Sequence, residues 1–212
     1  LTKEEIVNEA ATLFMAGYET TATTLAWAHY LLASAPKSEA TFLDEIQTVL
    51  GGRMPTLADV PKLTFCRAVI DETLRLYPPV PFLLRQAVHE DTIADTHIPA
   101  NSLVGVVPWL LQRNPSFWDD PDHFIPERFH GKSAQPFSYI PFAMGPRICA
   151  GVSFGLTEAV LCLAVLGQRL HMKVADGWDV RPVCHLTLKP QGGLPMGFHE
   201  RAQIAEISDV VA

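Results

Sequence analysis

The sequence predicts a mainly α-helical fold with a minor β component. Two observations carry this prediction: apolar residues recur at helical spacing over long stretches, and 11 of the 17 prolines fall within residues 78–146. With 212 residues, 48% of them hydrophobic, the chain can form a substantial core. No linker, repeat or low-complexity tract divides it, so we expect residues 1–212 to belong to a single domain.

The first predicted helix is long and largely buried, and runs from about Ile6 to Ser34. Thr2 is placed as its N-cap, with Glu5 as the partner in a capping box. Because the chain opens inside this element and without Met, we expect it to be truncated. Its apolar face is formed by Ile6, Ala10, Leu13, Phe14, Leu25, Ala28, Leu31 and Leu32. Further helices are expected after Pro36 as far as Gly51-Gly52, over 62–77 up to Pro78-Pro79, and over 152–170, the last with Phe154 on its apolar side.

The proline-rich segment predicts short strands joined by coil, because proline excludes long helices. Only Leu103–Trp109 has a clear strand pattern in this segment. The tail, Met172–Phe198, predicts short hairpins that turn at Asp176-Gly177 and at Gln191–Gly193.

The charge pattern excludes nucleic acid as a partner. The net charge is −7, and no run of five like charges is present. The longest apolar runs, Leu103–Leu111 and Ala159–Leu166, are shorter than the roughly 20 residues that span a bilayer. Four widely spaced cysteines fit a reducing compartment, so we expect a cytoplasmic location.

A proline- and glycine-rich loop, residues 142–151, delivers Cys149 to the start of the last helix. The N-terminus of a helix favours an anion, so it supports a thiolate at this position. Gly145 and Gly151 allow the backbone to approach a large flat ligand, Phe142 can pack beside the sulfur, and Arg147 can bind a carboxylate. The alternative interpretation of Cys149, taken alone, is a free buried cysteine that only contributes to packing.

This spacing of Phe, Gly, Arg, Cys and Gly resembles the haem-ligand signature of the cytochrome P-450 family. The resemblance runs from residue 1 to about residue 200 and covers only the second half of a family member, so the N-terminal half is absent. It implies haem b as cofactor, with Cys149 as the metal ligand of the iron. Arg147 and Arg85 are then expected to hold the propionates. Arg113 is a weaker candidate, because the family commonly has His at the preceding position, where this chain has Gln112.

Two further motifs carry the same resemblance. Glu72 and Arg75 lie three residues apart on one helix face, where they can pair, and Glu-x-x-Arg pairs are common on exposed helices. By resemblance, Arg128 from Pro-Glu-Arg-Phe joins them in a structural triad. The segment Ala-Gly-Tyr-Glu-Thr-Thr, residues 16–21, contains weak helix formers in mid-helix, which predicts a functional opening or close packing of a neighbour. It matches the family's oxygen-activation motif, which implies that Thr20 hydrogen-bonds near the iron-bound dioxygen and that Glu19 helps proton delivery.

The resemblance implies a monooxygenase that inserts one oxygen atom from O₂ into a small lipophilic substrate. Electrons are expected from a reductase or ferredoxin partner. Substrate contacts are expected from Ala16, Val80, Phe82, Leu83 and Leu186, for which ordinary core packing is the alternative. A peroxide-using or rearranging haem-thiolate enzyme is less consistent with the Glu19-Thr20 pair. The remaining alternative is a catalytically inactive fragment that binds haem or is inert.

Overall fold

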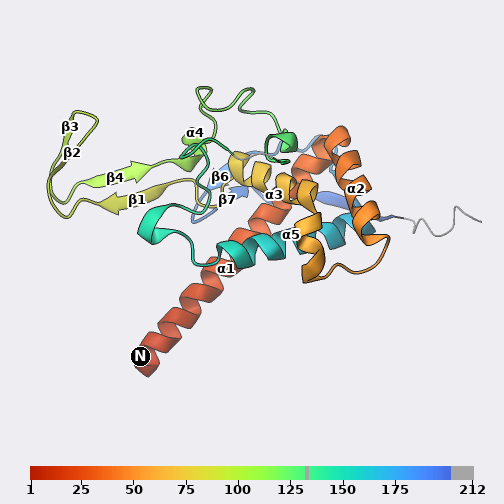
Figure 1. The fold of residues 1–212 in the computed structure, drawn as a ribbon, viewed down its shortest axis with the longest axis horizontal. Helices are drawn as coiled ribbons and strands as arrows, with labels where there is room; N and C mark the ends of the chain where they lie inside the picture. The colour runs from red at the N-terminus through yellow and green to blue at the C-terminus, as the bar shows by residue number, and fades with distance from the viewer. Residues whose placement is uncertain (132–133, 202–212) are drawn as a thin grey trace, which may run out of the picture.

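The computed structural model describes residues 1–131 and 134–201 and has the predicted mainly helical fold with small sheets (Figure 1). Its α-helices are α1 (Lys3–Ser34), α2 (Pro36–Leu50), α3 (Thr64–Leu76), α4 (Pro108–Leu111) and α5 (Val152–Arg169). Short 3-10 helices are η1 (Leu57–Lys62), η2 (Pro126–Arg128) and η3 (Gly145–Arg147). The strands are β1 (Leu83–Gln86), β2 (Asp91–Ile93), β3 (Thr96–Ile98), β4 (Leu103–Val106), β5 (Leu170–Val174), β6 (Pro182–Cys184), β7 (Leu188–Pro190) and β8 (Met196–Glu200).

The predicted helix ends are confirmed. The Thr2 hydroxyl accepts a hydrogen bond from the Glu5 amide at 3.2 Å, and the Glu5 carboxylate accepts one from the Thr2 amide at 2.6 Å. At the end of α2, Gly51 takes the left-handed conformation with φ of 56°, and its amide binds the Gln47 carbonyl.

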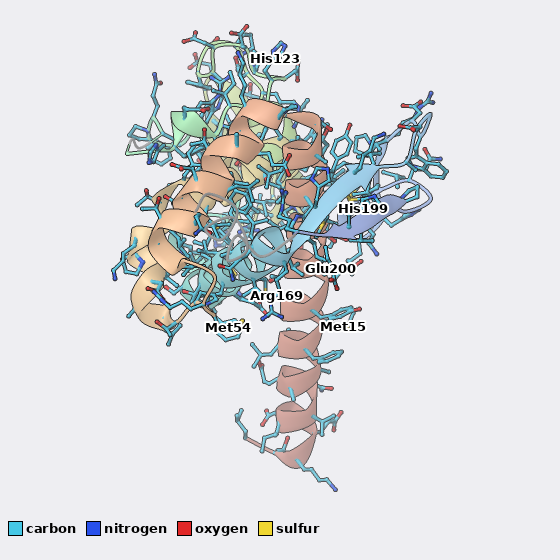
Figure 2. The ribbon with its side chains drawn as sticks, turned by 90° about the vertical axis from the view of Figure 1, so that its right-hand side faces the viewer. Met15, Met54, His123, Arg169, His199 and Glu200 are labelled. Atoms are coloured by element: carbon cyan, nitrogen blue, oxygen red, sulfur yellow. The ribbon has the colours of Figure 1, made fainter. Side chains whose placement is uncertain are left out.

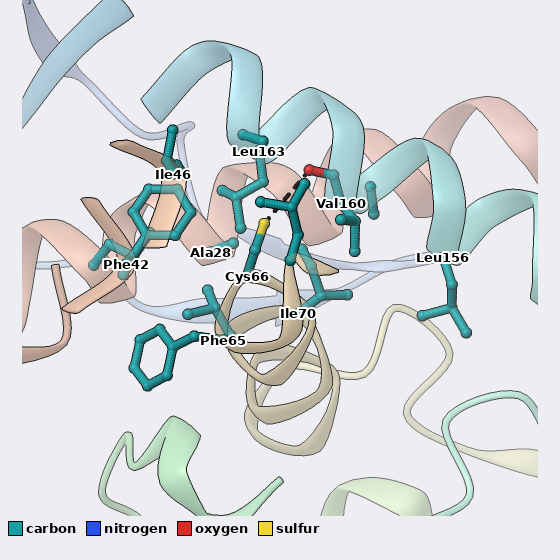
Figure 3. Packing of buried hydrophobic residues seen from close by; sticks show 14 of the residues in the cluster. Ala28, Phe42, Ile46, Phe65, Cys66, Ile70, Leu156, Val160 and Leu163 are labelled. Atoms are coloured by element: carbon teal, nitrogen blue, oxygen red, sulfur yellow. Dashed lines mark hydrogen bonds between the residues drawn. The ribbon is translucent and has the colours of Figure 1, made fainter. Parts of the chain in front are cut away.

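The core lies where α1, α2, α3 and α5 pack together (Figure 3). Cys66 of α3 is fully buried there, and its thiol donates to the Val160 carbonyl of α5 at 3.5 Å. The close approach of α5 to α2 requires a glycine, because a Cβ atom at Gly167 would lie 2.6 Å from Cζ of Phe42. Part of the apolar surface of α5 is buried in this core, through Leu156, Val160 and Leu163 among others. By length and hydropathy α5 could cross a membrane, but its buried side chains face α1, α2 and α3.

The prediction that the first helix is largely buried was wrong for its N-terminal half. The N-terminal half of α1 projects from the body of the fold, and its side chains are free on all sides, as around Met15 in Figure 2. Ile6, Leu13 and Phe14 are 55–72% exposed. The same correction applies to Phe154 of α5, which is 74% exposed. Helical periodicity identifies an apolar face, but it does not identify what covers that face.

The strands of the described residues form four antiparallel pairs, β1 with β4, β2 with β3, β5 with β8, and β6 with β7. The predicted strand at Leu103–Trp109 is shorter than expected, because the helix α4 begins at Pro108. The tail also differs from the prediction. The two glycine turns do not close hairpins, because they connect β5 to β6 and β7 to β8. The inner hairpin β6–β7 reverses between Cys184 and Leu188, and the outer strands β5 and β8 pair with each other.

Candidate haem-thiolate site

Cys149 is exposed and lies two residues before Gly151, the N-cap of α5. The loop that carries it is closed on itself, because the Cys149 amide donates to the Phe142 carbonyl at 2.9 Å. Within the loop, Gly145 has a φ of 70°, a conformation that favours glycine. A Cβ atom at Gly151 would lie 3.8 Å from the Cys149 sulfur, so the sulfur is held beside the first turn of α5. Phe142 is half-buried against the core and anchors the loop.

The two arginines expected at haem propionates are exposed. Arg85 lies on β1 and Arg147 in η3, and neither forms an ion pair with any residue that the structure describes. Arg113 is differently placed. Its guanidinium lies 3.6 Å from the centre of the Trp109 ring and forms an ion pair with Asp122 at 3.3 Å. Its position therefore has a local structural explanation.

The predicted oxygen-activation segment lies on α1 at the crossing with α5 (Figure 1). A Cβ atom at Gly155 of α5 would lie 3.9 Å from the Thr21 hydroxyl, which brings this segment close to the helix that follows Cys149. The helix is continuous through the segment, so the expected opening does not occur. Instead, the Thr20 hydroxyl donates to the Ala16 carbonyl at 2.7 Å, as threonine side chains commonly do in helices.

Glu19 forms an ion pair that sequence reasoning missed. Its carboxylate contacts the ammonium group of Lys189 on β7, and both side chains are partly exposed. The hydrogen bond from Lys189 lowers the pKa of Glu19. Leu188, the residue before Lys189, holds the hairpin in place: its carbonyl accepts from the Trp27 indole at 2.9 Å, and its amide donates to the Pro79 carbonyl at 3.0 Å.

Replacing Lys189 by Met should raise the pKa of the Glu19 carboxyl, because the cation that stabilises the carboxylate is lost. A ¹³C NMR titration of protein labelled at glutamate carboxyl carbons measures this directly, with Glu19→Gln assigning the resonance. Lys173→Met is the matched control, since Lys173 of β5 pairs with Asp176 in the turn that follows this strand, at 3.0 Å. An unchanged Glu19 midpoint in Lys189→Met would contradict the pairing.

The three residues of the predicted structural triad lie together. Glu72 and Arg75 are fully buried and form two parallel hydrogen bonds of 2.7 and 2.8 Å. Arg128 reaches the same Glu72 carboxylate at 3.4 Å. The remaining guanidinium N–H groups of Arg75 donate to the carbonyls of Gln112, Pro121 and His123 at 2.6–3.0 Å. The Arg75 side chain therefore fixes the irregular segment between α4 and η2 by binding the backbone carbonyls of that segment.

Three side chains that sequence reasoning did not assign to the site, the buried Trp118 and Gln112 and the partly buried Tyr139, fix residues 138–140, just before the cysteine loop. The Trp118 indole donates to the Ser138 carbonyl at 3.3 Å, and the Tyr139 hydroxyl donates to Asp71 of α3 at 3.0 Å. Gln112 accepts a hydrogen bond from the Ile140 amide at 2.9 Å. The only sequence signal was at Gln112, which replaces the family's usual His.

The predicted substrate residues occupy two neighbouring segments and one separate position. Val80, Phe82 and Leu83 follow the proline turn, and Leu186 lies at the tip of the β6–β7 hairpin, which is bonded to that turn at Pro79. Val80, Phe82 and Leu186 are 38–68% exposed, so these side chains are not ordinary core. Ala16 is exposed on α1. A surface hollow of about 460 Å³ lies elsewhere, between Leu31 and residues 120–125, and none of the predicted substrate residues lines it.

The fold is mainly helical, presents an exposed cysteine ahead of a core helix and buries a Glu–Arg pair on α3. Comparisons with known proteins identify the family that shares this fold. A family model described as Cytochrome P450 matches residues 1–195. Cyclooctatin synthase of Streptomyces melanosporofaciens is 38% identical over 89% of this chain and 42% of its own length. The crystal structure of the cytochrome P450DA heme domain matches with a TM-score of 0.88 and 30% identity, over 96% of this chain and 46% of that one.

The chain therefore belongs to the cytochrome P450 family. It spans less than half the length of these relatives, and the part it matches corresponds to the C-terminal half of the fold. LUTEIN DEFICIENT 5, a chloroplastic protein of Arabidopsis thaliana, is 33% identical over 99% of this chain and 36% of its own length.

Proposed function

We propose that the protein is a haem b monooxygenase that inserts one oxygen atom from O₂ into a small lipophilic substrate. The observation that carries the proposal is the exposed Cys149 sulfur, held by a closed loop at the start of α5. Relatives support the reaction type. Cyclooctat-9-en-7-ol 5-monooxygenase of Streptomyces melanosporofaciens is 36% identical over 87% of this chain.

The described residues fit a haem group. Cys149 offers a sulfur ligand, and the exposed Ile148 and Phe154 offer apolar surface next to it in the chain. Arg85 and Arg147 are cations without ion-pair partners among the described residues, as propionates require. When bound, the haem supplies the activation of dioxygen.

The chain itself would supply ligation and proton transfer. Cys149 would ligate the iron through its sulfur, which lies beside the first turn of α5. The Thr20 hydroxyl would donate a hydrogen bond on the oxygen side, which requires it to leave the Ala16 carbonyl. Glu19 would pass protons from solvent, and its ion pair with Lys189 keeps the carboxylate ionised until a proton arrives.

The substrate would contact Ala16, Val80, Phe82, Leu83 and Leu186, which are apolar or small and lie outside the core. Such a surface favours lipophilic molecules. Two electrons would come from a reductase or a ferredoxin. A cytoplasmic location remains part of the proposal.

The test is the absorption spectrum of the reduced, carbon monoxide-bound protein. The haem-loaded protein should show a strongly red-shifted Soret band, and Cys149→Ala should abolish it because no thiolate remains. Cys184→Ala is the matched control, since Cys184 is also exposed but lies on β6. Haem uptake without the red shift, or a red shift that survives Cys149→Ala, would refute thiolate ligation by Cys149. No haem uptake would favour the alternative of an inert fragment.

A further inference from the structure

Gln112 is a fully buried polar residue whose amide group is completely hydrogen-bonded. Its nitrogen donates to the carbonyls of Leu74 and Arg75, at 3.0 and 3.1 Å. These carbonyls belong to the last turn of α3, where no intrahelical donor is available. Its oxygen accepts from the amide of Ile140 at 2.9 Å. One neutral side chain therefore joins the end of α3 to Ile140, which lies 28 positions after Gln112 in the chain.

Ile140 is the start of the hydrogen-bonded path to the cysteine. The Ile140 carbonyl accepts a hydrogen bond from the Ala143 amide at 3.1 Å. Phe142 directly precedes Ala143, and its carbonyl accepts a hydrogen bond from the Cys149 amide. Ala143 has a φ of 60°, which is uncommon for a residue other than glycine. The Gln112 bond fixes the Ile140 amide, so it helps to impose this conformation.

Gln112 is also hydrogen-bonded to Arg75, one member of the buried ion pair. Its main-chain carbonyl accepts from the Arg75 guanidinium at 2.9 Å, while its side chain donates to the Arg75 carbonyl. Arg75 and Gln112 thus hold each other by two bonds, one in each direction. No ion pair or hydrogen bond joins Glu72 or Arg75 directly to the described residues of the cysteine loop, 142–151.

We propose that Gln112 is a positioning residue for Cys149, and that it transmits the fixed geometry of the Glu72–Arg75 pair to the cysteine loop. The functional consequence rests on the proposed thiolate ligation. The hydrogen bonds of Gln112 do not depend on it. An amide suits this place because it supplies two donors and an acceptor without a charge to desolvate. Leu supplies none of these, whereas His supplies one donor and one acceptor.

The first experiment measures amide hydrogen exchange in the haem-free protein. Gln112→Leu should accelerate exchange at the Ile140 and Cys149 amides by about tenfold or more, since a buried group loses its partner. Gln112→His should restore part of the protection. Gln168→Leu is the matched control, because Gln168 of α5 also donates to two carbonyls, those of Gly52 and Arg53, at 3.3 Å. Equal acceleration across all of α3 and the loop would indicate general loosening and overturn the proposal.

The second experiment follows the thiolate spectrum of the haem-loaded protein. Gln112→Leu should convert the red-shifted carbon monoxide complex to the form without a thiolate about tenfold faster than wild type, and should shift the haem reduction potential. The conversion rate and the reduction potential of Gln112→His should lie between those of Gln112→Leu and wild type. Gln168→Leu should match wild type in both. If Gln112→Leu leaves both the conversion rate and the potential unchanged, Gln112 does not position Cys149. A wild-type protein that binds no haem by thiolate would defeat the proposed function, while the exchange experiment still decides the positioning.

Discussion

Replacing Arg75 by Met should lower the free energy of unfolding by about 3–5 kcal/mol, the cost of leaving a buried charge without its partner. The Glu72 carboxylate is fully buried, and without Arg75 its partners among the described residues are the Ile125 amide at 2.9 Å and Arg128 at 3.4 Å. The carbonyls of Gln112, Pro121 and His123 lose their donor in the same variant. Both effects act on the segment that leads to the cysteine loop. Urea unfolding of the variant and wild type at pH 7 measures the difference.

The matched control is Arg67→Met, which makes the same substitution on the same helix. Arg67 pairs with Asp71 at 2.7 Å, but 46% of the Arg67 side chain is exposed, and the buried Asp71 carboxylate keeps its hydrogen bond from the Tyr139 hydroxyl. The loss of Arg67 should therefore cost less than the loss of Arg75, about 1–2 kcal/mol. The double variant Glu72→Leu/Arg75→Met should recover part of the loss, because it removes the uncompensated charge. A loss in Arg75→Met no larger than in Arg67→Met would mean that the buried pair does not stabilise the fold.

The parts of the fold that sequence predicted are those set by neighbours along the chain. The cap at Thr2 and the left-handed end at Gly51 depend on local backbone geometry, and both were identified from residue type and spacing. Local patterns also placed Glu72 and Arg75 three residues apart on one helix. Their complete burial, which distinguishes them from an ordinary surface pair, is a property of the packed fold.

The parts that sequence did not predict depend on distant segments. Lys189 lies 170 positions from Glu19, and only the docking of the β6–β7 hairpin on Trp27 and Pro79 brings them together. Gln112 was noted as an unusual residue, but its three partners come from the end of α3 and from Ile140. The prediction that the N-terminal half of α1 is buried failed for a related reason. The periodicity of Leu13 and Phe14 does not show whether another segment covers them.

Lowering the pH from 7.5 to 5 should destabilise the protein by about 2 kcal/mol through His29 alone. His29 of α1 is buried, its Nε2 atom has no hydrogen-bond partner among the described residues, and burial lowers its pKa from 6.5 to about 4. The side chains that line the small hollow around it include Glu39 of α2, Met172 of β5 and Arg201. The unfolded chain therefore binds a proton between pH 6.5 and 4 that the folded protein does not. The His29 contribution is fully present above pH 6.5 and is lost as the pH falls toward 4.

His29→Leu isolates this contribution, because every other titrating group is common to both proteins. At pH 7.5 the variant should be about as stable as wild type, since the lost imidazole nitrogen had no partner. At pH 5 the variant should be more stable than wild type by about 2 kcal/mol. Urea unfolding of both proteins at the two pH values gives the four free energies needed. If wild type and variant lose the same free energy between pH 7.5 and 5, His29 is not held neutral in the folded protein.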